Sequence, residues 1–226
     1  MRYIRSRVWR LLLILVVVVG PILPITPTVS VSSGQSSATL RGTIVAPVRR
    51  QASSLSFDDP PLVRELTGFP APAYVTEVDV AQRSGAVVLA VQSPFQSDGE
   101  FGADLVRLDV NSGQTTPLLS RATGAESLVT PNWSADGAWL LFEREDVSSP
   151  PVSWAGQGAV HYSSRVEAAG ADGSDRWTVV ENATRPTLSP DGADIAYLRA
   201  SESGTSLWVR PILGSAATER QLVPPG

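Results

Sequence analysis

The sequence contains no cysteine and no lysine, and it has a single histidine, His161, among 226 residues. Without cysteine, disulfide bonds, thiol catalysis and cysteine-ligated zinc are excluded. Without lysine, a Walker-type phosphate-binding loop and a lysine nucleophile are excluded as well. One histidine cannot build a metal site of several imidazoles, and it leaves one imidazole as a candidate general base. We therefore predict neither a bound metal nor a cofactor.

Negative charge is missing from the first quarter of the chain. Residues 1–57 hold 7 arginines and no acid, a net charge of +7, whereas residues 58–226 hold 11 arginines and 22 acids, a net charge of −11. Nucleic-acid-binding domains set basic patches against phosphate, so this acidic body argues against nucleic acid as a partner. Hydrophobic residues make up 42% of the chain, which predicts a globular body with a hydrophobic core.

Residues 1–31 have the pattern of a signal peptide or membrane anchor. Four arginines precede Leu11–Val19, a run of nine large aliphatic residues. The uncharged stretch 11–31 is long enough to cross a bilayer as one hydrophobic helix, and prolines weaken its outer half. The positive end should stay in the cytoplasm, so we expect the body outside it. The body is then either tethered to the inner membrane or secreted across it after cleavage near Ser30.

Residues 32–62 are expected to form a Ser-rich linker between this segment and the body. Arg41, Arg49 and Arg50 give the linker positive charge. That charge can contact anionic lipid headgroups or other envelope polymers. An isolated outer strand is predicted at Leu62–Thr67, where the linker meets the body.

The body, residues 63–226, contains an internal repeat. PNWSADGAWLLF (residues 131–142) and PTLSPDGADIAY (residues 186–197) align without a gap at an offset of 55 residues. Their shared Ser-x-Asp-Gly is typical of a tight turn, because aspartate hydrogen-bonds the nearby backbone and glycine accepts a positive φ. Asp136 and Asp191 are therefore interpreted as turn residues. A weaker copy with Gly85 in the turn lies 52 residues before Gly137.

Each copy is followed by a second strand–turn–strand unit, which makes four short strands per repeat. Four strands at a period of 52–55 residues are typical of a β-propeller blade. We predict an all-β fold, a partial propeller of about three four-stranded antiparallel blades at 69–120, 121–182 and 183–226. Two insertions, Ser93–Gly102 and Asp146–Gly158, follow the second strand of their blades. We expect them at one end of the propeller, as binding loops.

These motifs resemble the WD-like repeats of the TolB-type propeller family. The resemblance rests on PNWSADGAWLLF, RPTLSPDGADIAYLR, DLVRLDVNSGQTTPLL, SLWVRPILGSAATERQLV and VRELTG, and it covers residues 63–226. It implies a protein-binding scaffold of the bacterial envelope, a membrane-anchored sensor or regulator, or the gating propeller of a serine peptidase.

Three blades would leave two sheet edges exposed, whereas closed propellers have about 4–8 blades. Two explanations stay open. The chain is a piece of a longer protein, or it closes by self-association through the exposed blade edges, for example as a dimer with six blades.

Three residues beside the second insertion are the candidate binding residues: Trp154, His161 and Tyr162. An exposed tryptophan is a common anchor of binding surfaces, and Trp154 lies in the insertion itself. No Gly-x-Ser-x-Gly motif accompanies His161, so no catalytic residue is predicted.

Other candidates are interpreted structurally. Four tryptophans on predicted strands are expected in the blade cores: Trp133, Trp139, Trp177 and Trp208. Four nearby acids lack the spacing of a calcium loop and are expected on a solvated or partner-binding face: Glu126, Glu143, Glu145 and Asp146.

The sequence therefore favours a non-catalytic, extracytoplasmic propeller that binds a protein or an envelope polymer through its insertion loops. Two alternatives remain from other classes. One is the N-terminal propeller of a larger enzyme, such as a prolyl-oligopeptidase-type serine peptidase. The other is a carbohydrate-binding module.

Mass spectrometry of the native protein after membrane fractionation tests the N-terminal prediction. An uncleaved anchor predicts a mass near 23.9 kDa in the membrane fraction. A cleaved signal predicts a loss of about 3 kDa, because about 30 residues are removed. A mass far above 24 kDa would contradict both and identify the sequence as a piece of a longer chain.

Overall fold

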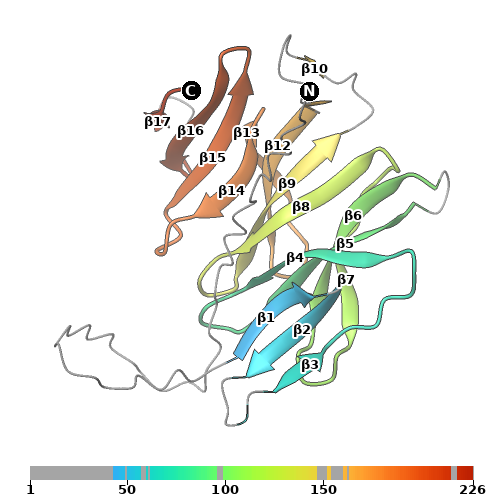
Figure 1. The fold of residues 1–226 in the computed structure, drawn as a ribbon. Coiled ribbons are helices and arrows are strands. Elements are labelled where there is room, and N and C mark those ends of the chain that lie inside the picture. The colour runs from blue at the N-terminus through green and yellow to red at the C-terminus, as the bar shows by residue number, and fades with distance from the viewer. Residues whose placement is uncertain are drawn as a thin grey trace, which may run out of the picture.

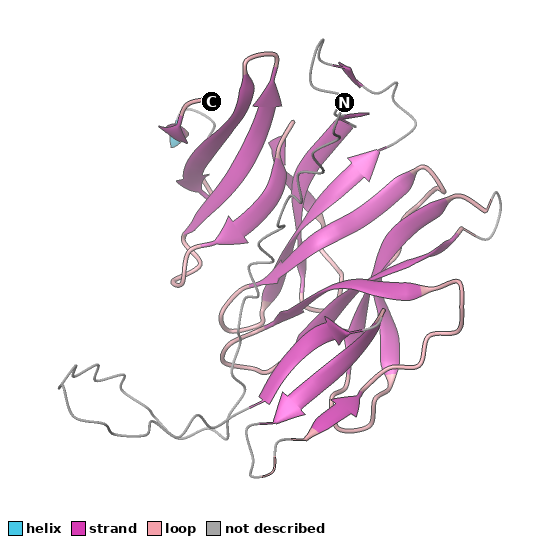
Figure 2. Ribbon diagram, viewed as in Figure 1, coloured by secondary structure: helices cyan, strands magenta, loops and turns pink. Residues whose placement is uncertain are grey.

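The computed structural model describes residues 43–48, 50–56, 60, 62–95, 99–146, 152–153, 160–161, 163–214 and 218–225. Among these residues the regular structure consists of β-strands and a single 3₁₀ turn at Thr218, with no α-helix (Figure 2). The predicted hydrophobic helix at 11–31 lies outside the described residues. Within them, no helix is long and apolar enough to cross a membrane.

Three four-stranded antiparallel sheets follow one another along the chain, and we call them blades 1, 2 and 3 (Figure 1). Blade 1 consists of β4 (Tyr74–Val80), β5 (Val87–Pro94), β6 (Phe101–Leu108) and β7 (Thr115–Leu119). Blade 2 consists of β8 (Glu126–Trp133), β9 (Trp139–Asp146), β12 (Ser163–Gly170) and β13 (Trp177–Glu181). Blade 3 consists of β14 (Thr184–Leu188), β15 (Asp194–Ser201), β16 (Gly204–Pro211) and β17 (Arg220–Val223).

The two predicted insertions both connect the second and third strands of their blades. In blade 1 both ends of the first insertion extend the hairpin, because β5 runs to Pro94 and β6 begins at Phe101. In blade 2 the second insertion contains a separate pair of short strands, β10 (Val152–Ser153) and β11 (Val160–His161).

An additional three-stranded sheet precedes blade 1, and it corrects the predicted linker. It consists of β1 (Thr43–Val48), β2 (Gln51–Ser56) and β3 (Val63–Glu65), in that order. Arg50, with φ of 72°, completes the turn between β1 and β2. Small side chains let β2 pack closely: Ala52, Ser53 and Ser54 are all buried. The later serines of the predicted linker thus belong to a packed strand, and the outer strand predicted at Leu62–Thr67 is the third strand of this N-terminal sheet.

The Ser-x-Asp-Gly turns have the predicted geometry in both copies. In blade 2 the Asp136 carboxylate accepts hydrogen bonds from the Ser134 hydroxyl (2.7 Å) and from the Ala138 N–H (3.0 Å). In blade 3 Asp191 accepts the equivalent bonds from Ser189 (2.5 Å) and Ala193 (3.1 Å). These donors hold the pKa of both carboxyls below the ordinary value. Both aspartates are therefore turn residues, as interpreted from the repeat.

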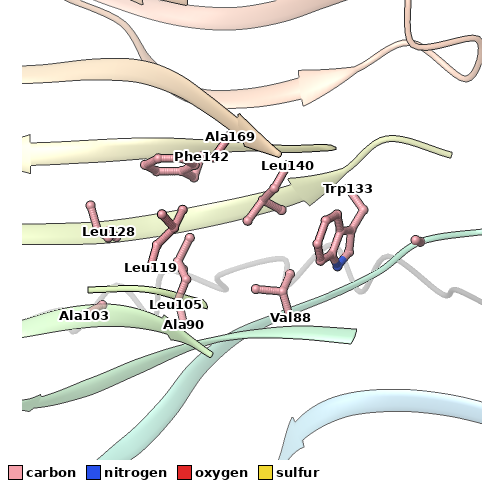
Figure 3. Close-up of a cluster of buried hydrophobic side chains, with 11 residues drawn as sticks. Val88, Ala90, Ala103, Leu105, Leu119, Leu128, Trp133, Leu140, Phe142 and Ala169 are labelled. Carbon is pink, nitrogen blue, oxygen red and sulfur yellow. The ribbon is translucent and has the colours of Figure 1, made fainter. Parts of the chain in front are cut away.

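The core lies between successive sheets. Figure 3 shows the cluster between blades 1 and 2, in which Val88, Leu105 and Leu119 of blade 1 meet Leu140 and Phe142 of blade 2. A second cluster joins the N-terminal sheet to blade 1, and a third joins blade 2 to blade 3. Each of blades 1 and 2 therefore buries both of its faces, whereas blade 3 buries only the face toward blade 2.

The tryptophans divide between core and surface. Trp133 is buried in the cluster between blades 1 and 2, and Trp139 and Trp208 are half-buried against the cluster between blades 2 and 3. The expectation of a core position is wrong for Trp177, which is 38% exposed. It begins β13, the outermost strand of blade 2, where less of the neighbouring sheet is available to cover it.

Glycines in the outer turns of blades 1 and 2 let each turn pack closely against the backbone of the preceding sheet. A Cβ at Gly113 would lie 2.7 Å from the Leu66 carbonyl oxygen, and a Cβ at Gly173 would overlap the Leu118 carbonyl oxygen. Both glycines have positive φ, 74° and 84°. The same close approach of turn to backbone therefore recurs at two consecutive sheet contacts.

We expect Gly173→Ala to destabilise the fold more than Gly192→Ala does. Both glycines have positive φ, so both variants incur the left-handed strain of roughly 1–2 kcal/mol. Only at Gly173 does the added carbon also meet backbone, since the nearest atom to a Cβ at Gly192 is 4.0 Å away. Urea unfolding of the two variants measures the difference. Equal losses of stability would contradict a close contact between the Gly173 turn and the Leu118 carbonyl oxygen.

Candidate functional site

A cavity of about 840 Å³ lies where the innermost strands of the three blades, β4, β8 and β14, converge (Figure 1). We call it the hub cavity. Its walls carry three carboxylates, Glu77 on β4 and Glu143 and Glu145 on β9, together with Arg185 on β14. Uncharged polar side chains such as Thr76 and Gln92, and apolar ones from blades 2 and 3 such as Val129 and Leu198, complete the lining.

Two of these carboxylates hold consecutive blades together. Glu77 of blade 1 accepts a hydrogen bond from the Thr130 N–H of blade 2 (2.5 Å). Glu143 of blade 2 accepts one from the Arg185 N–H of blade 3 (2.9 Å). The two donors occupy equivalent positions of the repeat, each directly before a proline. Both have positive φ, 49° and 50°, and both lie in an irregularity of the innermost strand pairing.

The local backbone explains why these N–H groups point into the hub. A residue before proline avoids the helical region, and a positive φ is costly for a side-chain-bearing residue. The irregularity removes Thr130 and Arg185 from the regular ladder of their sheets. Their N–H groups are thereby available to a carboxylate on the preceding blade. The hydrogen bond to a charged acceptor is strong enough to offset such strain.

Burial and mutual repulsion make the hub carboxylates hold protons more tightly than usual. Burial raises the pKa of Glu77 and of Glu143 above the ordinary value, and their backbone hydrogen bonds oppose it. Burial, followed by the charges of Glu143 and Glu77, raises the pKa of Glu145 to about 7. The Arg185 charge favours ionisation of Glu77 and Glu143. Glu145 receives no hydrogen bond from the described residues.

This arrangement suits a positively charged organic group. Carboxylates in a partly dehydrated cavity attract a guanidinium or ammonium group strongly, and the bond formed relieves the repulsion among them. Within the part of the chain that the structure describes, no three histidine, cysteine, aspartate or glutamate residues are placed to hold a metal ion.

The structure corrects the expected position of the acidic residues. Glu143 is 3% exposed and Glu126 is 6% exposed, so neither lies on a solvated face. Glu126 is paired with Arg144 and accepts a hydrogen bond from the Ala122 N–H (2.9 Å). Glu77 and Arg185 were not singled out from the sequence. Both residues lie on innermost strands, and Arg185 directly precedes the proline that the two clear copies of the repeat share. These two features were the signal that the sequence offered.

The three candidate binding residues lie at the edge of what the structure describes. Trp154 and Tyr162 fall outside the described residues. The backbone of His161 pairs with Val152 in the small β10–β11 sheet of the second insertion. Their binding role stays a prediction.

Comparison with known proteins identifies the fold. No protein-family model matches the chain, and no curated protein matches it. A solved prolyl endopeptidase structure is similar over 84% of this chain and 29% of its own length, with 16% identity and a TM-score of 0.53. Oligogalacturonate lyase from Vibrio parahaemolyticus is similar over 77% of this chain and 48% of its own length, with 12% identity and a TM-score of 0.53.

TolB from Acinetobacter baumannii is similar over 75% of this chain and 37% of its own length, with 12% identity and a TM-score of 0.49. The chain thus spans less than half the length of each of these three structures. Together with the four antiparallel sheets, the two likenesses with a TM-score of 0.53 define the fold as an all-β partial propeller and confirm the fold class predicted from the repeat.

We expect Glu145→Gln to stabilise the protein at pH 8 and to have little effect at pH 5. Burial raises the pKa of Glu145 from 4.5 to about 7, so the folded chain binds this proton more tightly than the unfolded chain does. The stability that this proton contributes is complete below pH 4.5 and is lost as the pH rises through about 7.

Thermal unfolding at the two pH values measures the effect. Solvent reaches this carboxylate, which limits the gain at pH 8 to about 1 kcal/mol, or about 2–4 °C. Glu202→Gln, at an exposed turn of blade 3, is the matched control and should change neither melting temperature. An equal shift at both pH values would contradict the raised pKa.

Proposed function

We propose that this chain is the propeller of a non-catalytic, TolB-type binding protein of the bacterial envelope, and that its partner is a protein with a positively charged segment. The observation that carries this proposal is the hub cavity with Glu77, Glu143 and Glu145 in its walls. Residues 58–226, which include the walls of the cavity, have a net charge of −11, which steers a basic partner toward it.

The size and lining of the hub cavity favour part of a polypeptide as the ligand. A volume of about 840 Å³ accepts a few side chains and is within the usual range of ligand sites. Arginine and lysine have apolar stems and charged ends. Val129 and Leu198 offer contacts to the stems, while the carboxylates accept hydrogen bonds from the ends.

The location outside the cytoplasm is supported by the N-terminal pattern of arginines followed by residues 11–31. The insertion loops that follow β5 and β9 supply a second surface, with Trp154, His161 and Tyr162 beside it, for a protein or an envelope polymer. In this proposal the scaffold binds through two regions, the hub cavity and the insertion loops.

A second candidate function is the propeller of a larger prolyl-oligopeptidase-type serine peptidase. The likeness to a prolyl endopeptidase over 84% of this chain favours it, since the chain would be one part of a longer enzyme. A carbohydrate-binding module is the remaining alternative. The lyase named among the similar structures acts on oligogalacturonate, a polyanion, which three hub carboxylates would repel.

Binding of a fluorescent arginine-rich peptide, measured by anisotropy at low salt, tests the proposed function. We expect the protein to bind the peptide at pH 8 and to bind it more weakly at pH 6, where Glu145 is protonated. Glu145→Gln should weaken binding at pH 8 by roughly tenfold, the effect of losing one charge-assisted hydrogen bond.

The matched control is Glu65→Gln, which removes the same charge from the exposed strand β3 of the N-terminal sheet, outside the lining of the hub cavity. An equal loss of affinity in both variants would reduce the effect to net charge and contradict a site in the hub. Labelling of the native protein by a fluorophosphonate, together with cleavage of a prolyl peptide, would instead establish the peptidase.

A further inference from the structure

Both ends of the stack of sheets carry an apolar row that crosses three strands. In blade 3 the row is Leu198, Leu207 and Val223, which are paired in register across β15, β16 and β17. In the N-terminal sheet the row is Ile44, Leu55 and Val63, paired across β1, β2 and β3. We call these the blade-3 row and the N-terminal row.

The equivalent rows inside the stack are completely covered. In blade 1 the row is Ala90, Leu105 and Leu119, with exposures of 0%, 0% and 8%. In blade 2 it is Glu143, Val166 and Val180, with exposures of 3%, 0% and 3%. In each case the following blade covers the row, and the contact is one of the core clusters. A row at this position is therefore the surface on which the next sheet packs.

The two terminal rows do not cover each other within one chain. Val223 is 51% exposed and Val63 is 64% exposed. Figure 1 places β17 and β3 at opposite ends of the stack. The blade-3 row thus lies on the face that packs against the following sheet in blades 1 and 2. The N-terminal row lies on the opposite face, which in blades 1 and 2 packs against the preceding sheet.

We propose that the blade-3 row packs against the N-terminal row of a second copy of this chain, so that two chains close a ring. The contact would continue the sheet-on-sheet packing that already joins the N-terminal sheet, blade 1, blade 2 and blade 3. Each chain contributes one row of each kind, so two head-to-tail contacts satisfy both chains. Four packed sheets per chain give a ring of eight, within the range of about 4–8 blades that closed propellers have.

Charge does not oppose this contact. Residues 43–65 hold three arginines and three acids, and residues 183–226 hold four of each, so both terminal sheets are neutral within an acidic body. Ring closure also completes the hub cavity. Leu198 belongs to the blade-3 row and lines that cavity, so the partner copy would form the wall beyond β15.

Sedimentation equilibrium of the full chain in a mild detergent tests the proposal. We expect the wild type to be a dimer. Val63→Asp and Val223→Asp each place a charge in one contact surface, and each should weaken dimerisation roughly tenfold or more. Because both valines are more than half exposed, neither variant should disturb the fold, and circular dichroism checks this. Leu213→Asp, at an exposed leucine outside both rows, is the matched control and should stay dimeric.

An equimolar mixture of Val63→Asp and Val223→Asp gives the decisive result. Each variant keeps the row that the other has lost, so a mixed dimer has one unaltered contact. The mixture should therefore form a dimer at concentrations at which each variant alone is mostly monomeric. Association through residues 11–31 would leave both variants dimeric and would overturn the proposal. A monomeric wild type would also overturn it, and would assign the rows to further blades of a longer chain or to another protein. Mass that grows with concentration beyond the dimer would overturn closure of the ring.

Discussion

Hydrogen bonds that the backbone of one blade donates to side chains of the preceding blade determine how the sheets are oriented. Asp79 on β4 accepts a bond from the Trp133 N–H (2.5 Å), and Asn132 on β8 accepts one from the Leu188 N–H (3.0 Å). Both pairs occupy equivalent positions of the repeat. Apolar packing between two sheets is non-directional and would permit them to slide. A directional bond at the innermost strands removes that freedom, and the position of the hub cavity follows from it.

The acidity of the hub cavity arises from the same construction. Glu77 and Glu143 are acceptors for backbone N–H groups of the following blade, so the fold itself requires carboxylates at the centre. Their partial burial then raises the cost of a further charge nearby. Glu145 lies two residues beyond Glu143 on the same face of β9 and receives no such bond from the described residues. Its charge is therefore the one most directly available to a ligand.

The sequence predicts the parts of the fold that depend on neighbouring residues. Ser134 and Asp136 form their turn through contacts within five positions, and Ser189 and Asp191 repeat it. The hub could not be predicted this way, because Glu77 meets a partner 53 residues away. The solvated face expected for Glu143 was also wrong, since a sheet that packs on both faces buries polar as well as apolar side chains in the middle of its strands. The strand β2 was missed because serines are typical of linkers.

The bonds between innermost strands constrain the two blades that they join unequally. The acceptor must be a short side chain that ends in oxygen, as Asp79 and Asn132 do. The donor is a main-chain N–H, which any residue except proline supplies, and the two donor positions here hold residues as different as tryptophan and leucine. The hydrogen bond itself therefore places no requirement on the side chain of the donor residue. Two chains can therefore keep the same relation between their sheets while their sequences differ at most positions, as the 12–16% identity to structures of the same fold illustrates.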